Sequence, residues 1–277
     1  MKKAALKLIP AVCMLLISAM MLGTTTYAWF SMSNQVQATG MQVQAKAESG
    51  LVIRNAETTQ SGVVYNNWST ASPAQHADPV LLIPTSTADL VHWYHNQSSL
   101  ISSAMPNQST GYTLEETLTS RADEYNSDLF ACYKYYIKTT DAHNLTVTSL
   151  RVKQIAVTFP DTQQSTNLNK ALRVGVIAVP GDTGMGGGTN GDVLAIYAPV
   201  DGATTSYHVN HDSSTITANG KDTPVQLTNV TSIPFSDLGL AVYIYIWFEG
   251  EDNNCRSSNV TATLDNLQVA VTFDYTN

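Results

Sequence analysis

The sequence is poor in charge, and most of the charge it carries is acidic. Only 13% of its 277 residues are charged, with 14 Lys and Arg against 22 Asp and Glu. Proteins that bind nucleic acid need clustered basic side chains, so this balance argues against a nucleic-acid partner. The chain is long enough to bury a sizeable core, and we expect one domain over residues 29–277.

Motifs for catalysis and for cofactor binding are also missing. The sequence contains no His-Glu-x-x-His zinc-protease motif and no Gly-x-Ser-x-Gly nucleophile motif. Its glycine-rich stretch at 181–191 lacks the Lys-Ser/Thr pair of a phosphate-binding P-loop. The six histidines are expected to be loop residues rather than metal ligands. We therefore predict that the protein is not an enzyme and has no catalytic residue, cofactor or transition-metal site.

Cysteine is scarce, with three in the whole chain. Cys13 lies in an N-terminal segment that export would remove, which leaves Cys132 and Cys255. In an oxidising compartment these two could form a disulfide, which would contribute roughly 4–5 kcal/mol by closing a long loop. Two buried thiols are the alternative, and the sequence does not decide between them.

Residues 1–28 have the pattern of a secretion signal. A short basic stretch precedes an apolar segment from Leu8 to Leu22, and Thr26 and Ala28 are small residues at the positions that signal peptidase reads. We predict cleavage by signal peptidase between Ala28 and Trp29. Cleavage removes three lysines and no acid, so 11 basic and 22 acidic residues remain and the formal charge becomes −11. The apolar segment is shorter than the roughly 20 residues of a usual membrane span, so we expect a secreted chain without a membrane anchor after cleavage.

Strand patterns dominate the rest of the chain. Apolar and polar residues alternate from 267 to 273, the period of a strand with one buried face. Leu240 to Phe248 is apolar at every position, which is typical of a strand covered on both faces. Other strand patterns lie at 41–47, 51–53, 130–139, 145–159, 172–179 and 193–200. Many short strands separated by turn residues predict an all-β fold, an antiparallel β-sandwich of jelly-roll type.

Residues 56–128 contain four prolines and are expected to form a long loop-rich insertion. Within it, Thr113 and Glu116 have the spacing of a helix capping box, and apolar residues follow on one face. This pattern predicts one short helix.

The aromatic residues of the insertion include Tyr65, Trp68, Trp93 and Tyr94. We expect them to form a small core that holds the insertion against the domain. Stacking on sugars is the alternative, and it would make the chain a cell-surface module that binds carbohydrate or a host molecule.

A polar segment follows the apolar strand that ends at Phe248. Its oxygen-bearing side chains are candidates for calcium ligands, namely Glu249, Glu251, Asp252 and Asn254. Their spacing does not match an EF-hand, so a polar turn is favoured and calcium binding is the alternative.

After cleavage, residues 29–47 would form the new N-terminus and read as a strand. This arm carries five apolar residues, Trp29, Phe30, Val36, Met41 and Val43. An exposed strand with such residues is an aggregation hazard unless it is paired. Inserted beside a strand of a neighbouring subunit, the arm would gain main-chain hydrogen bonds and apolar pockets. Because arm and groove are different surfaces, such contacts join subunits head-to-tail into a filament. The alternative is that the arm completes a sheet of its own domain.

The junction Tyr27-Ala28-Trp29-Phe30-Ser31, followed by Asn34, Val36 and the strand 40–43, resembles the TasA/camelysin family of secreted, signal-peptidase-processed proteins of Gram-positive bacteria. The resemblance lies mainly in residues 20–55. It implies a jelly-roll subunit of an extracellular fibre in a biofilm matrix, in which the arm of one subunit completes the sheet of the next. Camelysin has been called a metallopeptidase, but the zinc motif is missing here, so peptidase activity is the least favoured function.

Overall fold

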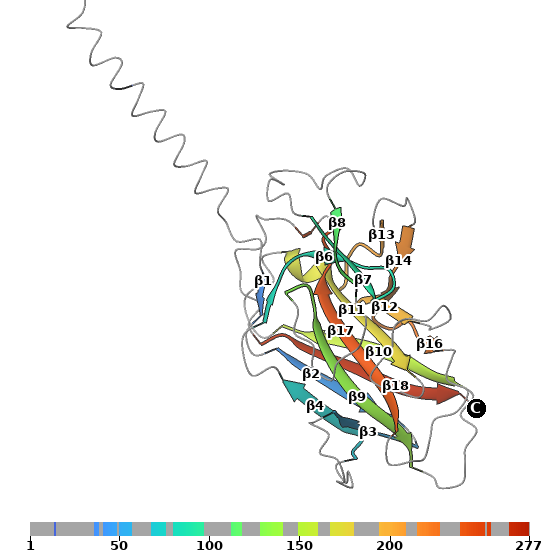
Figure 1. Cartoon of the computed structure of the whole chain (residues 1–277). Helices are drawn as coiled ribbons and strands as arrows, with labels where there is room; N and C mark the ends of the chain where they lie inside the picture. The colour runs from blue at the N-terminus through green and yellow to red at the C-terminus, as the bar shows by residue number, and fades with distance from the viewer. Residues whose placement is uncertain are drawn as a thin grey trace, which may run out of the picture.

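The protein folds as an all-β sandwich (Figure 1). The computed structural model describes residues 14, 36–38, 41–48, 50–56, 68–75, 80–96, 112–117, 128–140, 149–159, 167–179, 194–208, 215–227, 239–252, 254–255 and 266–276. Two large sheets lie face to face, and the predicted all-β sandwich is confirmed. Within the described residues, no helix is long and apolar enough to cross a membrane.

The first sheet has five strands, and its hydrogen bonding is mixed rather than purely antiparallel. In spatial order the strands are β16 (Val225–Leu227), β10 (Ser149–Thr158), β18 (Gln268–Thr276), β2 (Gln42–Ala47) and β4 (Ala71–Gln75). The exception to antiparallel pairing is β2 with β18, which run parallel, with Val43 opposite Val269. The two ends of the sequence therefore meet in the middle of this sheet.

The second sheet has six strands. In spatial order they are β15 (Asn219–Gly220), β12 (Leu194–Ala198), β11 (Leu172–Val179), β17 (Leu240–Phe248), β9 (Ala131–Thr139) and β3 (Leu51–Asn55). All nine residues of β17 are buried. Its even-numbered residues face the first sheet and its odd-numbered residues belong to a second cluster on the opposite face. The prediction of a strand covered on both sides is confirmed.

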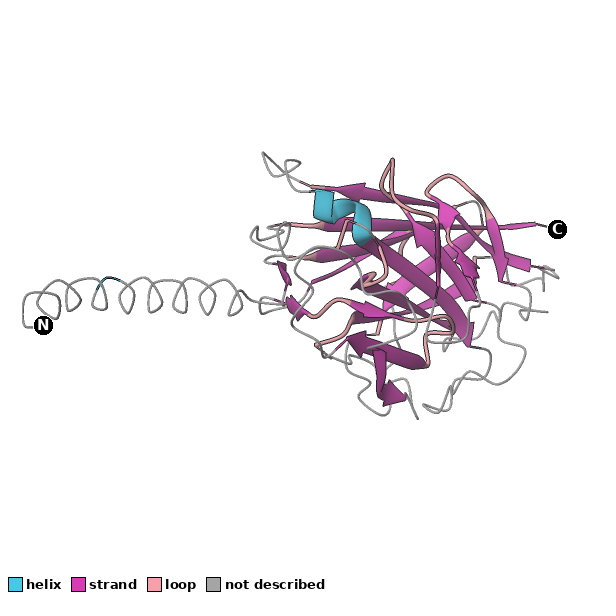
Figure 2. Cartoon of the chain, turned by 90° about the horizontal axis from the view of Figure 1, so that it is seen from above, coloured by secondary structure: helices cyan, strands magenta, loops and turns pink. Residues whose placement is uncertain are grey.

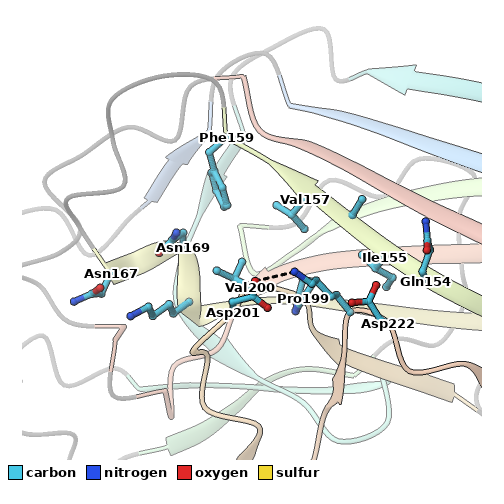
Figure 3. A pocket seen from close by; sticks show the side chains of 13 residues that line it. Gln154, Ile155, Val157, Phe159, Asn167, Asn169, Pro199, Val200, Asp201 and Asp222 are labelled. Atoms are coloured by element: carbon cyan, nitrogen blue, oxygen red, sulfur yellow. Dashed lines mark hydrogen bonds and ion pairs between the residues drawn. The ribbon is translucent and has the colours of Figure 1, made fainter.

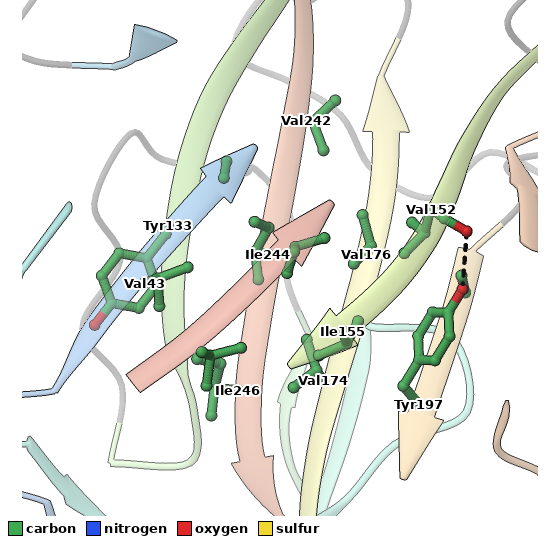
Figure 4. Close-up of a cluster of buried hydrophobic side chains, with 14 of the residues drawn as sticks. Val43, Tyr133, Val152, Ile155, Val174, Val176, Tyr197, Val242, Ile244 and Ile246 are labelled. Carbon is green, nitrogen blue, oxygen red and sulfur yellow. Dashed lines mark hydrogen bonds between the residues drawn. The ribbon is translucent and has the colours of Figure 1, made fainter. Parts of the chain in front are cut away.

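The main core fills the space between the two sheets (Figure 4). Branched aliphatic side chains dominate it, among them Val43, Ile155, Val174, Ile244 and Ile246. Each such side chain contributes roughly 1.5–3 kcal/mol when it is buried.

Two buried tyrosines link the sheets across this core. The hydroxyl of Tyr135 donates to the Val43 carbonyl at 2.8 Å, and that of Tyr197 donates to the Thr223 carbonyl at 3.0 Å and the Val152 carbonyl at 3.4 Å. Burial raises the pKa of both hydroxyls, so both stay protonated as donors.

A smaller three-stranded sheet packs on the outer face of the six-stranded sheet. Its strands are β6 (Thr85–Ser86), β7 (His92–Asn96) and β8 (Tyr112–Thr117). Trp93 is fully buried here, with its ring stacked on Phe130 at 4.2 Å and edge-on to Trp247 at 5.5 Å between centroids. Of the four aromatic residues expected to form a small core under the insertion, Trp93 is the one at the centre of this contact, and its ring partners come from outside the insertion.

The predicted helix beginning at Thr113 is wrong, because residues 112–117 form strand β8, paired antiparallel with β7. The capping-box spacing is a local signal, and hydrogen bonding to the edge of β7 outweighs it. The segment 56–128 is likewise less loop-rich than expected, since it supplies β4, β5 (Val80–Leu82), β6, β7 and β8. Within residues 36–276, the helical element that the structure describes is the short 3-10 turn η1 (Asn167–Ala171), which appears in cyan in Figure 2.

Candidate assembly surface

The N-terminal segment divides into two parts with different roles in the fold. Residues 36–38 form β1 (Val36–Ala38), which pairs antiparallel with β5 in a separate two-stranded sheet. The cleavage residues Ala28 and Trp29, and the arm residue Phe30, lie outside the described residues.

The second part, β2, belongs to the core of its own chain. Met41 and Val43 are buried, and β2 is hydrogen-bonded to β18 on one side and to β4 on the other. These two residues were expected to be part of a donated arm, but removing them would open the five-stranded sheet. Any exchangeable arm must therefore end before Met41.

A strand of another chain could pair with a free edge of either large sheet. Most of these edges are covered by the chain itself. At one side of the sandwich, Ile53 of β3 exchanges backbone hydrogen bonds of 2.7 and 3.0 Å with Ser69, next to β4. At the other side, β15 pairs with β12 of one sheet while β16 pairs with β10 of the other. The segment from β15 to β16 thus passes from one sheet to the other.

The segment from β15 to β16 covers only part of β10, and a groove opens beyond it (Figure 3). β16 pairs with Leu150 to Val152, and the Ile155 amide donates to the Lys221 carbonyl at 2.8 Å. Past Ile155, no described strand pairs with this side of β10. A groove of about 640 Å3 lies here. Its apolar lining comes from the end of β10 and from the turn after β12, with Ile155, Val157, Phe159, Pro199 and Val200.

The rim of the groove is polar and its charges are balanced. Lys221 donates to Asp201 at 2.8 Å, and this hydrogen bond raises the pKa of Lys221, so the lysine stays charged. Lys170 and Asp222 also line the rim. An uncharged segment therefore fits the groove better than a strongly charged one.

The calcium candidates that follow β17 form a network inside the protein. Glu249 and Asp252 are both fully buried. Asp252 accepts from the Arg173 guanidinium at 2.6 Å and from the Asn254 amide at 2.8 Å. The Glu249 carboxylate accepts from the Trp247 indole at 3.2 Å and from the Glu251 backbone amide at 3.1 Å.

In this network the positive charge beside the buried carboxylates comes from the Arg173 guanidinium, whereas in a calcium site it would come from the ion. Arg173 is fully buried and also donates to the Thr204 carbonyl at 2.7 Å and the Lys170 carbonyl at 2.9 Å. In the part of the chain that the structure describes, no group of three His, Cys, Asp or Glu side chains could hold a metal ion. The segment is thus the polar turn that was favoured, and it closes over a buried ion pair. Sequence reasoning missed Arg173, although it is the only charged residue between Leu172 and Val179.

The two cysteines do not form a disulfide. Both are free and buried. Cys132 belongs to the cluster outside the six-stranded sheet, whereas Cys255 belongs to the main core between the sheets. Because that sheet separates the two thiols, the alternative of two buried thiols holds in this structure. Burial raises the pKa of the Cys255 thiol, so it stays protonated.

The aromatic residues of the 56–128 segment do not form an open platform for sugars. Trp93 is fully buried and cannot stack on a ligand. Trp68 is half-buried, and its ring lies 4.4 Å from Lys138 Nζ and 5.1 Å from the Arg54 guanidinium carbon. Tyr65 lies outside the described residues. The described rings are thus engaged in packing and cation-π contacts.

Comparison with known proteins gives no match. No family model, no curated protein and no solved structure is similar to the chain. The likeness of residues 20–55 to the TasA/camelysin family therefore stays a prediction, and function has to be argued from the surface described above.

Proposed function

We propose that the chain is a secreted structural protein without enzymatic activity, a subunit that assembles head-to-tail through its N-terminal segment into an extracellular fibre or matrix. The observation that carries this proposal is the division of the N-terminal segment near Gly40. Residues after it form the buried strand β2, whereas β1 before it pairs only with β5, over three residues.

The energetic cost of breaking the pairing of β1 with β5 is small. A three-residue ladder is a marginal structure, and neither large sheet loses a strand when β1 leaves. The same segment placed against a sheet edge of another subunit would gain hydrogen bonds and bury its apolar side chains. Exchange between subunits is therefore accessible without unfolding the sandwich.

Assembly by this route needs the signal peptide to be removed. Cleavage after Ala28 would create a free N-terminus at Trp29, and the 12 residues from Trp29 to Gly40 contain no charged side chain. A neutral strand with aromatic residues at its end is suited to an apolar groove and unsuited to water.

The test compares the mature chain that begins at Trp29 with a chain that begins at Met41. We expect filaments in electron micrographs of the first and monomers with an unchanged circular dichroism spectrum for the second. A third chain, in which residues 29–40 are replaced by a Gly/Ser sequence of equal length, controls for length and should also stay monomeric. Filaments formed by the chain that begins at Met41 would contradict the proposal, and so would a mature chain that never assembles.

A further inference from the structure

The outer side of β10 has hydrogen-bonding groups that no described strand uses. In an antiparallel strand, the N–H and C=O of one residue point to the same side, and this side alternates along the chain. The Ile155 amide points outward, since it donates to the Lys221 carbonyl. The N–H and C=O of Val157 therefore point outward as well, and past Ile155 no described strand lies there to receive them.

The side chains along the same stretch are incompletely covered. Ile155 is buried in the main core, whereas Val157 and Phe159 pack against that core but remain partly exposed. Opposite them stand Pro199 and Val200, which form the second wall of the groove (Figure 3). A strand added at Val157 would cover these side chains and extend the five-stranded sheet by one.

The N-terminal segment has the pattern that this position requires. From Phe30 to Ala38 the even-numbered residues are Phe30, Met32, Asn34, Val36 and Ala38, apolar except for Asn34, and the odd-numbered residues are Ser31, Ser33, Gln35 and Gln37. A strand in the groove would turn its apolar side to Val157, Pro199 and Val200 and its polar side to the polar lining and to water, which is the period-2 pattern of an edge strand. Twelve uncharged residues span up to about 40 Å, which is ample for the few residues that the groove admits.

We propose that the groove between Val157 of β10 and Val200 is the acceptor for the N-terminal segment of a second copy of this chain, bound by strand addition to β10. The inference rests on the proposed function and adds the site at which the segment binds. The second copy is the occupant because the segment and the groove are different surfaces of one chain, so that each subunit can donate once and accept once.

The test removes the N–H of Val157, which points away from β18, and leaves the hydrogen bonds between β10 and β18 in place. Val157→Pro eliminates that donor, and proline is tolerated where the N–H of a strand faces away from its neighbour. Val157→Ala, which keeps the N–H, is the matched control. In the mature chain, we expect the proline variant to raise the protein concentration needed for filament growth by about tenfold or more, and the alanine variant to change it by much less.

A second variant keeps the test valid if the proline disturbs folding. Phe159→Asp places a charge on the apolar floor and leaves the backbone intact, so it should also suppress filaments while the circular dichroism spectrum stays unchanged. If both variants fold and both assemble like the mature chain, the groove proposal is wrong.

The two proposals fail in different ways. If removing residues 29–40 abolishes filaments but Val157→Pro and Phe159→Asp do not, the segment binds elsewhere and only the groove is refuted. Filaments without residues 29–40 would refute both. A mature chain that stays monomeric at every concentration, with residues 29–40 held in its own groove, would also refute donation between copies.

Discussion

The free energy of unfolding should depend on pH through Glu249. This carboxyl group is fully buried beside a second buried carboxylate, Asp252, and the single guanidinium of Arg173 is the cation of the cluster. Burial raises the pKa of Glu249 to about 7, although the charge of Arg173 and hydrogen bonds from the Glu251 amide and the Trp247 indole oppose the rise.

The sign of the effect follows from proton binding. A glutamate in the unfolded chain has a pKa near 4.5, so the folded chain holds the proton more tightly than the unfolded chain does. The stability associated with this proton is fully present below about pH 4.5 and is lost as the pH rises through 7. A difference of roughly 2.5 pKa units corresponds to about 3 kcal/mol between the two limits.

The measurement is urea unfolding followed by tryptophan fluorescence, between pH 4.5 and 8, on the mature chain and on Glu249→Gln. Glutamine is uncharged throughout, so the variant should gain about 3 kcal/mol relative to the natural chain over this range. Asp201→Asn is the control, because Asp201 and Lys221 form a solvent-exposed pair whose loss should change stability little at any pH in this range. A difference between the natural chain and Glu249→Gln that stays constant from pH 4.5 to 8 would refute the reasoning.

Three further predictions concern the same part of the fold. Arg173→Met leaves two buried carboxylates without their cation and should lower the free energy of unfolding by about 3–5 kcal/mol in the same assay. Gly175→Ala places a methyl group 2.7 Å from a Leu90 methyl carbon, so it should lower the free energy of unfolding by about 1–3 kcal/mol, and in a background that carries Leu90→Ala the same change should cost less. A thiol reagent should label Cys132 and Cys255 only after denaturant is added, whereas a disulfide found by mass spectrometry of the folded protein would contradict their separation by the sheet.

The strands with the clearest periodicity could be predicted from the sequence. The unbroken apolar run of β17 predicted burial on both faces, and the alternation at 267–273 predicted a strand with one buried face. Both patterns are set by the residues of the strand itself, because the side-chain period of a strand is fixed at two. The structure bears out both.

Pairing between distant segments could not be predicted in this way. The parallel contact of β2 with β18 joins residues more than 200 positions apart, and no local pattern specifies which strand becomes the neighbour of which. Strand β8 shows the same limit, because its local helix signal yields to hydrogen bonding with β7. The groove is likewise a consequence of pairing, since it exists because β16 ends three residues short of Ile155 on β10.

In the proposed assembly, the boundary near Gly40 would separate the residues that the chain needs for folding from those that bind the next subunit. Every residue of β2 is paired with β18, and Gln42 to Lys46 are also paired with β4, so the sandwich can be completed before the N-terminal segment finds a partner. A subunit built in this way is stable alone and does not depend on its neighbour for a core strand. The bond between subunits would then rest on a few backbone hydrogen bonds at Val157 and on the apolar side chains of residues 29–38. Such a junction is reversible, and its strength would rise with the apolar surface that the segment buries, which makes Trp29 and Phe30 the residues that set filament stability.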